Sequence, residues 1–362
     1  MRTLGLQCIV LLASCLGPDL GLDAQTARAA ELQAVLDRWA TLPGRQGVTA
    51  SVILPDGTQW SGVAGFEKAS VPMRPEHLIW IASVTKTMTG AVILQLAEEG
   101  RLSLADTLGR WLPPLANVDP AITIRQLLNH TSGLSSYAPA PLFRAKGDST
   151  YVFSPAELAT TIAPPVAAPG VKTHYTNTTF LLLGWIAERV TGQPLARAFH
   201  ERLWDPLGLE EIFLAGREPA VGAVADGFLP DGTGPIPPLA NLSRSSAGHG
   251  AGSVFTTARN LARWGQALFT GKVLSPGMQA AMRTLVPAAG NIPGESGAGL
   301  GIRGYDFLGG RQYGHSGGAV LGTTLLVYDP ESGVVVAVMI NRGSSPDHFQ
   351  LVPELLAVAR KG

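Results

Sequence analysis

Two residues three positions apart, Ser83 and Lys86, combine a nucleophile with a base. A serine hydroxyl is a poor nucleophile until a neighbouring base takes its proton. Residues three apart on a helix share a face, so Lys86 can reach the Ser83 oxygen. Lys86 must be neutral to act as a base, and the apolar residues 79–81 favour the burial that would lower its pKa. The spacing predicts serine acyl transfer, although a capping serine followed by a solvated lysine gives the same pattern.

A second pair, Tyr175 and Asn177, precedes another predicted helix. A tyrosine hydroxyl near a lysine ammonium can be held partly ionised and can pass protons to or from the serine. The Asn177 amide offers both a donor and an acceptor, which can orient the lysine and a substrate amide. The pair is also compatible with an ordinary helix entry.

The third candidate segment is a run of small residues: His315, Ser316, Gly317 and Gly318. We expect it to lead into an apolar strand, where small residues let a substrate approach the strand edge and add its own backbone. Its position also makes the Gly318 backbone N–H a candidate oxyanion donor, together with the free N–H of Ser83 at its helix start.

Other chemistry finds no support in the sequence. The remaining histidines show no paired metal spacing, and neither a phosphate loop nor a dinucleotide fingerprint occurs, so we expect no metal and no cofactor. We interpret these histidines as structural or surface groups, with His174, next to Tyr175, as the best candidate for lining a cleft.

The composition limits the partners. The 362 residues carry 27 basic and 27 acidic side chains, giving a net charge of zero. A neutral chain without a basic run argues against nucleic acid and against electrostatic membrane binding. We therefore expect a small-molecule or short-peptide substrate, while the sequence leaves the oligomeric state open.

The first 29 residues predict a leader. An apolar stretch at 4–13 follows Arg2 and is too short to span a bilayer, which is typical of a signal peptide. Cleavage after Ala29 and a lipoprotein site at Cys15 both remain open. Either one predicts an exported protein, periplasmic or secreted, with a membrane link only through a lipid on Cys15. Cys8 and Cys15 are the only cysteines, so the mature domain has no disulfide.

Periodicity and turn signals predict strands at both ends of the chain and helices in the middle. The expected strands are 48–54, 59–66, 323–328 and 334–340. The expected helices are 31–40, 84–99, 123–129, 154 onward, 178–190, 194–203, 257–269, 276–285 and 351–360. This order indicates an α+β domain over residues 30–362, with an α/β part at about 30–105 and 250–362 and an inserted helical part at about 106–249.

Taken together, the three segments resemble the serine β-lactamase and penicillin-binding-protein superfamily, closest to class C β-lactamases and the D,D-carboxypeptidases of peptidase family S12. That family has Ser-x-x-Lys, Tyr-x-Asn and Lys/His-Ser/Thr-Gly in this order. The stretch 124–134, Pro169-Gly170 and Gly299-Leu300-Gly301 look similar as well. The resemblance implies a mainly antiparallel sheet flanked by helices, a helical subdomain, and the site between them.

The resemblance also implies a mechanism. Ser83 would form an acyl-enzyme, Lys86 and Tyr175 would handle protons, and the N–H groups of Ser83 and Gly318 would form the oxyanion hole. Asn177 and the segment beginning at His315 would bind the substrate.

One departure bears on the substrate: His315 stands where class C β-lactamases have a lysine. A histidine is often neutral at pH 7, which favours a D-amino-acid peptidase, carboxypeptidase or esterase over efficient penicillin hydrolysis. A β-lactamase, a transesterase and a penicillin-binding sensor that acylates without turnover remain the alternatives. If His315 were a cation that binds a substrate carboxylate, KM for acidic substrates should rise above its pKa.

Overall fold

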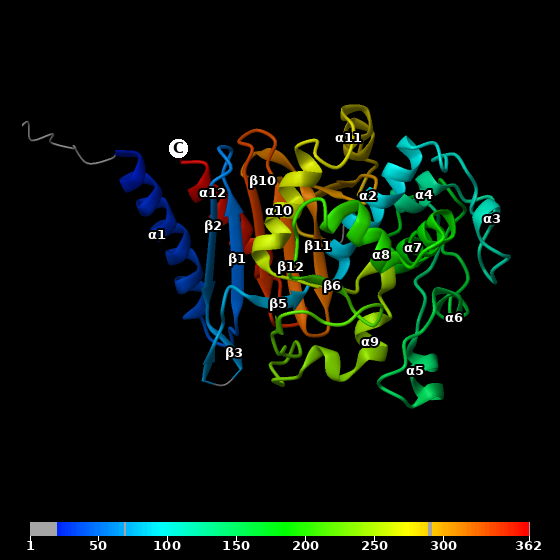
Figure 1. The fold of residues 1–362 in the computed structure, drawn as a ribbon, viewed down its shortest axis with the longest axis horizontal. Helices are drawn as coiled ribbons and strands as arrows, with labels where there is room; N and C mark the ends of the chain where they lie inside the picture. Colours follow the sequence, from blue (N-terminus) through cyan, green and yellow to red (C-terminus); the bar gives the residue numbers. More distant parts are fainter. Residues whose placement is uncertain (1–19, 69, 289–291, 362) are drawn as a thin grey trace, which may run out of the picture.

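The computed structural model describes residues 20–68, 70–288 and 292–361 (Figure 1). The apolar segment 4–13 and both cysteines lie outside these residues. The α-helices are α1 (Leu20–Ala40), α2 (Thr85–Glu98), α3 (Leu108–Trp111), α4 (Ile124–Leu128), α5 (Ala140–Lys146), α6 (Pro155–Ala159), α7 (Asn177–Thr191), α8 (Leu195–Phe199), α9 (Leu242–Ser246), α10 (Ala258–Phe269), α11 (Pro276–Arg283) and α12 (His348–Ala359). The shorter helical segments are η1 (Ala82–Val84), the π-helix η2 (His200–Trp204), η3 (Pro238–Ala240) and η4 (His249–Ala251).

A seven-stranded antiparallel sheet forms the centre, in the order β2-β1-β13-β12-β11-β10-β9. Its strands are β1 (Val48–Ile53), β2 (Gln59–Ala64), β9 (Glu295–Ala298), β10 (Arg303–Phe307), β11 (Gly310–Ala319), β12 (Gly322–Tyr328) and β13 (Val335–Ile340). The first strand of the chain, β1, therefore pairs with the last strand, β13, on one side and with β2 on the other, so both ends of the chain build one sheet, as the α+β prediction requires. The predicted fold class is confirmed.

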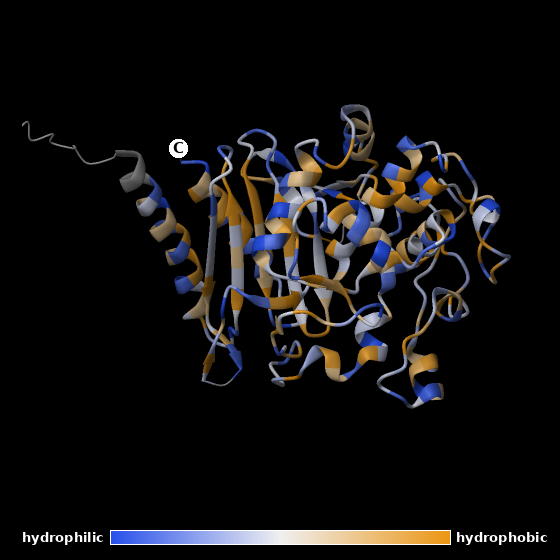
Figure 2. Cartoon of the chain, in the orientation of Figure 1, coloured by the Kyte–Doolittle hydropathy of each residue, from blue (hydrophilic) through white to orange (hydrophobic). Residues whose placement is uncertain are grey.

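Helices cover both faces of this sheet. Alternate residues of β13 point to opposite faces: Val336 and Val338 pack with α1 and α12, whereas Ala337 and Met339 join the core that includes α2, α7 and α10. Both faces of the strand are buried, which explains why it is apolar throughout. In Figure 2 the central strands are largely hydrophobic, while α1 and α10 carry hydrophilic residues as well.

Local signals fix many element ends. The β1–β2 hairpin turns at Gly57, whose φ of 87° suits glycine. Ser154 and Thr123 form capping boxes at the starts of α6 and α4. Gly192 ends α7 in the left-handed conformation. The expected strands 48–54 and 59–66 and the expected helices near 123–129, from 154 onward and at 178–190 are present.

The middle of the chain supplies the second part of the fold. Helices α3 to α9 lie between residues 106 and 249, on the right in Figure 1. The same part of the chain contributes β6 (Ile212–Leu214) and β7 (Ala223–Val224). A small sheet ordered β6-β8-β5-β7 includes β5 (His77–Trp80) and β8 (Val254–Thr256), and a further hairpin joins β3 (Phe66–Lys68) and β4 (Val71–Pro72). β5 matters most for function because it leads directly into η1, which holds Ser83.

Two predicted boundaries are wrong. Helix α1 begins at Leu20 rather than at 31, since residues 20–30 contain good helix formers and no proline. The segment from His315 to Gly318 lies inside β11 itself rather than before a strand. Its glycines have poor strand propensity, and pairing with β12 imposes the extended backbone. None of the described helices is long and apolar enough to cross a bilayer.

Candidate active site

Ser83 lies at the end of a tight turn that precedes α2. Ala82 adopts a left-handed φ of 46°, which is unfavourable for a residue with a Cβ and is held by the surrounding structure. Ser83 follows in η1 and is half-buried. Lys86, in the first turn of α2, is fully buried, and its Nζ lies 2.9 Å from Ser83 Oγ. The predicted helical spacing therefore brings the two groups together.

Besides Ser83 and the Tyr175 hydroxyl, Lys86 Nζ contacts two carbonyl-type oxygens. It donates to Asn177 Oδ1 at 2.8 Å and to the Ala251 carbonyl at 2.7 Å. A neutral amine uses its two hydrogens on these oxygens, which leaves its lone pair for the Ser83 hydroxyl. Burial lowers the pKa of Lys86, a nearby Tyr175 anion opposes the shift, and Arg303 adds to it. The surroundings thus favour the form of lysine that can accept a proton.

Tyr175 completes this cluster from the loop before α7. Lys86 Nζ lies 5.0 Å from the centroid of the Tyr175 ring. Burial alone would raise the pKa of the phenol, but the charge of a protonated Lys86, the charge of Arg303 and hydrogen bonds with Lys86 and Ser83 outweigh it, so the pKa lies below its ordinary value. Asn177 is the first residue of α7, which is how one helix start presents Tyr175 and Asn177 to the same lysine.

Strand β11 forms the opposite wall. Gly317 packs directly on the turn of Ser83: a Cβ at this position would lie 2.2 Å from the Ile81 carbonyl oxygen and 3.2 Å from the Ser83 nitrogen. Only glycine permits this approach. Ser316 and His315 are buried, whereas Gly318 is exposed and has open space beside it. The structure therefore brings the three predicted segments to one place, with a free approach at Gly318.

Arg303 is a member of the site that sequence reasoning missed. It begins β10, is 4% exposed, and its Cζ lies 4.3 Å from the Tyr175 ring centroid. It forms an ion pair with Glu295, and its Nε has no hydrogen-bond partner among the described residues. The one feature of the sequence that could have pointed to Arg303 is its position as a charged residue in a mostly uncharged stretch, directly after Gly299-Leu300-Gly301.

Sequence reasoning also did not single out His130. The His130 ring packs on Tyr175, with 4.6 Å between the ring centroids. His130 is buried, and burial together with the charge of Arg303 holds its pKa well below the usual value. It therefore acts as a neutral wall behind the tyrosine.

Asn341, at the end of β13, hydrogen-bonds the backbone of Gly47, Glu67 and Asp226, so it holds the fold together.

His315 is a neutral group in this setting. Its Nδ1 lies 2.6 Å from the Ser316 carbonyl, so this nitrogen carries the proton. Burial first, and then the charges of Arg303 and Lys86, hold its pKa well below the usual value. The hypothesis of a cationic His315 is thus not supported, and Arg303 remains as the fixed positive charge nearby.

We expect KM for a substrate with a free carboxylate to stay level between about pH 5.5 and 8.5, because His315 is uncharged throughout this range. Initial rates over the range measure KM, and the corresponding amide-capped substrate is the control. A KM that rises with pH for the acid alone would show that His315 is charged at the lower end.

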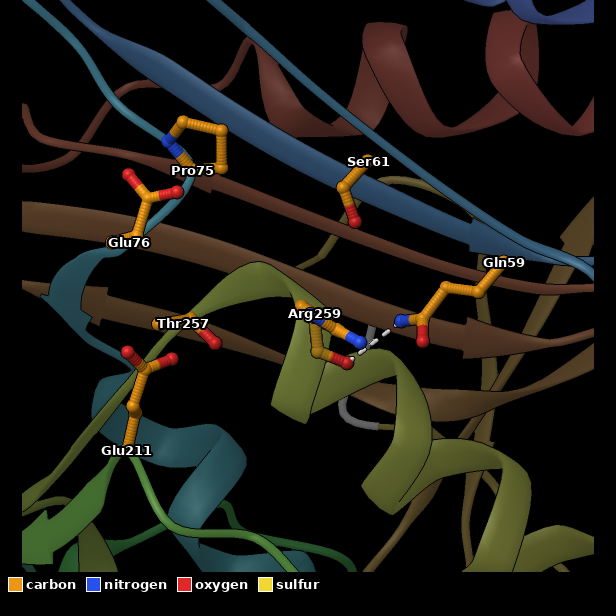
Figure 3. A pocket seen from close by; sticks show the side chains of 7 residues that line it. All are labelled: Gln59, Ser61, Pro75, Glu76, Glu211, Thr257 and Arg259. Carbon is orange, nitrogen blue, oxygen red and sulfur yellow. Dashed lines mark hydrogen bonds between the residues drawn. The ribbon is translucent and has the colours of Figure 1, made fainter.

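Another concave surface lies apart from these residues. A pocket of about 330 Å³ lies between β2, the segment before β5 and the start of α10. Figure 3 shows the side chains that line it, among them the polar Glu76, Glu211 and Arg259. None of the candidate reactive residues lines it. Within the described part of the chain, no group of three histidine, cysteine or acidic side chains is arranged to hold a metal ion.

Comparisons with known proteins agree with this geometry. A family model described as Beta-lactamase matches residues 34–361. Penicillin-binding protein 4 of Amycolatopsis lactamdurans is 32% identical over 79% of this chain and 78% of its own length. Esterase EstB of Burkholderia gladioli is also 32% identical, over 59% of this chain and 58% of its own.

A solved structure extends the similarity to the fold. The D-stereospecific amidohydrolase from Streptomyces sp. superimposes with a TM-score of 0.78 at 28% identity, covering 90% of this chain and 97% of that one. With the family match spanning almost all of the described residues, the chain belongs to the β-lactamase family of serine hydrolases, within the serine β-lactamase and penicillin-binding-protein superfamily.

Proposed function

We propose that this chain cleaves amide or ester bonds through an acyl-enzyme on Ser83, acting on D-amino-acid derivatives or simple esters rather than on β-lactams. The observation that carries the proposal is the 2.9 Å contact between Ser83 Oγ and the buried Lys86 Nζ, beside the open Gly318. A solvated lysine would be protonated at neutral pH and could not take the serine proton.

In the acylation step, Ser83 Oγ attacks the substrate carbonyl carbon while its proton passes to Lys86. The carbonyl oxygen becomes an oxyanion, for which we assign the N–H groups of Ser83 and Gly318 as donors. The bond to the leaving group then breaks as Tyr175, which shares protons with Lys86, delivers one to the departing atom. Asn177 holds Lys86 in place through its Oδ1.

In the deacylation step, a water molecule attacks the ester carbonyl of the acyl-enzyme. Tyr175 and Lys86 take a proton from this water, and Ser83 recovers its own as the acid leaves. The same pair thus acts as base and acid in turn, which suits two groups whose pKa values both lie below their ordinary values.

The preference against β-lactams rests on β11. Class C β-lactamases resemble this chain but present a lysine where His315 stands, and His315 is uncharged here. The names of two relatives point the same way, since one is an esterase and another a D-stereospecific amidohydrolase. Because another relative is named Penicillin-binding protein 4, we include slow acylation of Ser83 by penicillins as a side reaction.

The test compares four substrates at equal enzyme concentration: p-nitrophenyl acetate, the p-nitroanilides of D-alanine and L-alanine, and a chromogenic cephalosporin. We expect steady turnover of the ester or of the D-anilide, a lower kcat/KM for the L-anilide than for the D-anilide, and the lowest kcat/KM for the cephalosporin. Faster cephalosporin hydrolysis would identify a β-lactamase instead. One equivalent of product followed by no turnover would identify a penicillin-binding sensor.

We also propose that the protein is exported, because residues 2–13 read as a signal peptide. Separating the culture fluid, periplasm and membrane of the source cells, with immunodetection of residues 30–362, tests this. Detection of the unprocessed chain in the cytoplasm alone would contradict it.

A further inference from the structure

An apolar cavity of about 200 Å³ lies at the far end of β11, beyond Gly318. Its walls come from β5, from the turn after β11, and from the segment 229–241 with η3. Most of the lining side chains are apolar: Trp80, Leu229, Ile236, Pro237, Pro238, Ala240, Val320 and Leu321, with Asn241 and Arg244 as the polar members. An apolar cavity of roughly 150 Å³ holds benzene, so this one has room for about one aromatic ring or a branched alkyl group.

Trp80 is a rigid wall of this cavity. Its indole nitrogen donates to the Gly252 carbonyl at 2.5 Å, and its ring stacks on Phe255 with 5.6 Å between centroids. The ring is 8% exposed. Since its one polar atom is already bonded, Trp80 presents only apolar surface to the cavity.

Two short chain segments connect the cavity to the reaction centre, one from Trp80 to Ser83 and the other from Gly318 to Val320. Trp80 stands three residues before Ser83, at the end of β5. Val320 stands two residues after Gly318, which in extended chain is roughly 7 Å. β10 pairs with β11 only as far as Gly314, so the backbone from His315 to Ala319 has no strand partner on that side among the described residues. An extended substrate can lie along this open edge.

The position of the proton donor gives the direction of the substrate. Tyr175 lies at the His315 end of the open edge, with 6.1 Å between the two rings. A leaving group must reach its proton donor, so the leaving group points toward His315. The acyl part then extends the other way, past Gly318 toward Val320.

We infer that the cavity between Trp80 and Val320 receives an apolar group of about one ring in size on the acyl part of the substrate. The inference rests on the proposed function, since it assigns the acyl side of the same serine. It predicts that the enzyme selects substrates by the acyl group: derivatives of aromatic or branched aliphatic amino acids, or of aryl-alkyl carboxylic acids, react faster than acetyl or alanyl ones.

The experiment keeps the leaving group constant and changes the acyl group. The substrates are p-nitrophenyl esters of acetic, butanoic, hexanoic and 3-phenylpropanoic acid, and each rate is divided by that ester's own rate with hydroxide. The measured quantity is the acylation rate from the first release of p-nitrophenol, which does not require turnover. We expect kcat/KM to rise about fourfold per methylene that enters the cavity and about tenfold or more for the phenyl ester over the acetate.

Two cavity variants and one matched control locate the effect. Val320→Phe fills the cavity, and the preference for the phenyl ester over the acetate should fall toward one. Val221→Phe makes the same change at a residue that is 39% exposed and does not line the cavity, so it should keep the wild-type preference. Ala240→Phe narrows the cavity from another segment and should act like Val320→Phe.

A flat dependence on acyl size in the wild type, with acetate hydrolysis abolished by Ser83→Ala, would overturn this inference and leave the proposed function standing. A rising dependence that survives both Val320→Phe and Ala240→Phe would place the acyl group elsewhere and also overturn it. Esters that react no faster than with Ser83→Ala would contradict the proposed function, and the inference with it.

Discussion

Ser83→Ala is expected to lower kcat/KM for every substrate by about 10⁴-fold or more, since nucleophile removal in serine hydrolases has effects of this order or larger. Besides Ser83, Lys86 hydrogen-bonds the Tyr175 hydroxyl, Asn177 Oδ1 and the Ala251 carbonyl, and we assign Tyr175 to proton transfer rather than to attack on the substrate. Without Ser83 Oγ the acyl-enzyme ester cannot form, and a water molecule in the site cannot take its place in that covalent intermediate. The measurement is steady-state hydrolysis of the best substrate, with an active-site titration of the wild type.

The control for this variant is Ser61→Ala. Ser61 is exposed and lines the polar pocket of Figure 3, away from the cluster around Lys86. Its loss should leave kcat/KM at the wild-type value. Equal activity of Ser83→Ala and the wild type would show that Ser83 is not the nucleophile. A loss of activity in Ser61→Ala as large as in Ser83→Ala would indicate that the reaction takes place in the pocket of Figure 3 instead.

Lys86→Met is expected to reduce kcat by about 10²- to 10⁴-fold, the range that a positioned base contributes. Methionine fills a similar volume in this fully buried position but cannot take the Ser83 proton. The Asn177 amide oxygen and the Ala251 carbonyl lose their donor, which lowers the stability to unfolding. Removing a buried amine from an apolar setting offsets part of that loss.

The matched control for the second variant is Lys68→Met. The Lys68 side chain is 44% exposed, and its partners are Glu67 and Asp226 rather than any of the reacting groups. It should keep the wild-type kcat. Thermal unfolding of both variants shows whether a lower kcat comes from the missing base or from a protein that no longer folds. A kcat within tenfold of the wild type for folded Lys86→Met would contradict the role of Lys86 and leave Tyr175 as the base.

The reacting groups and several elements follow from the sequence because their signals are local. Ser83 and Lys86 meet through one turn of helix, and Tyr175 and Asn177 meet through one helix start. The hairpin at Gly57 and the capping box at Ser154 depend on residues within a few positions of each other. The order of the three segments carried the family resemblance, which the comparisons confirm.

Arg303 and His130 could not be predicted in the same way. Both act on Tyr175 across long sequence separations, and no local pattern distinguishes them from an ordinary strand arginine and a loop histidine. The roles of the site residues remain predictions that the experiments above address, and the boundaries of the helical part also remain a prediction.

The sequence by itself determined which side chains can do chemistry, since residue type and short spacing decide that. Only the tertiary structure decided their charge states. Burial of Lys86 and His315 lowers the pKa of each, because a charged group in a desolvated site loses its hydration, and burial is a property of the whole fold. The open edge of β11 beside Ser83 is also a property of the whole fold. It exists because β12 pairs with the glycines of β11 on one side, while the pairing of β10 with β11 on the other side ends at Gly314.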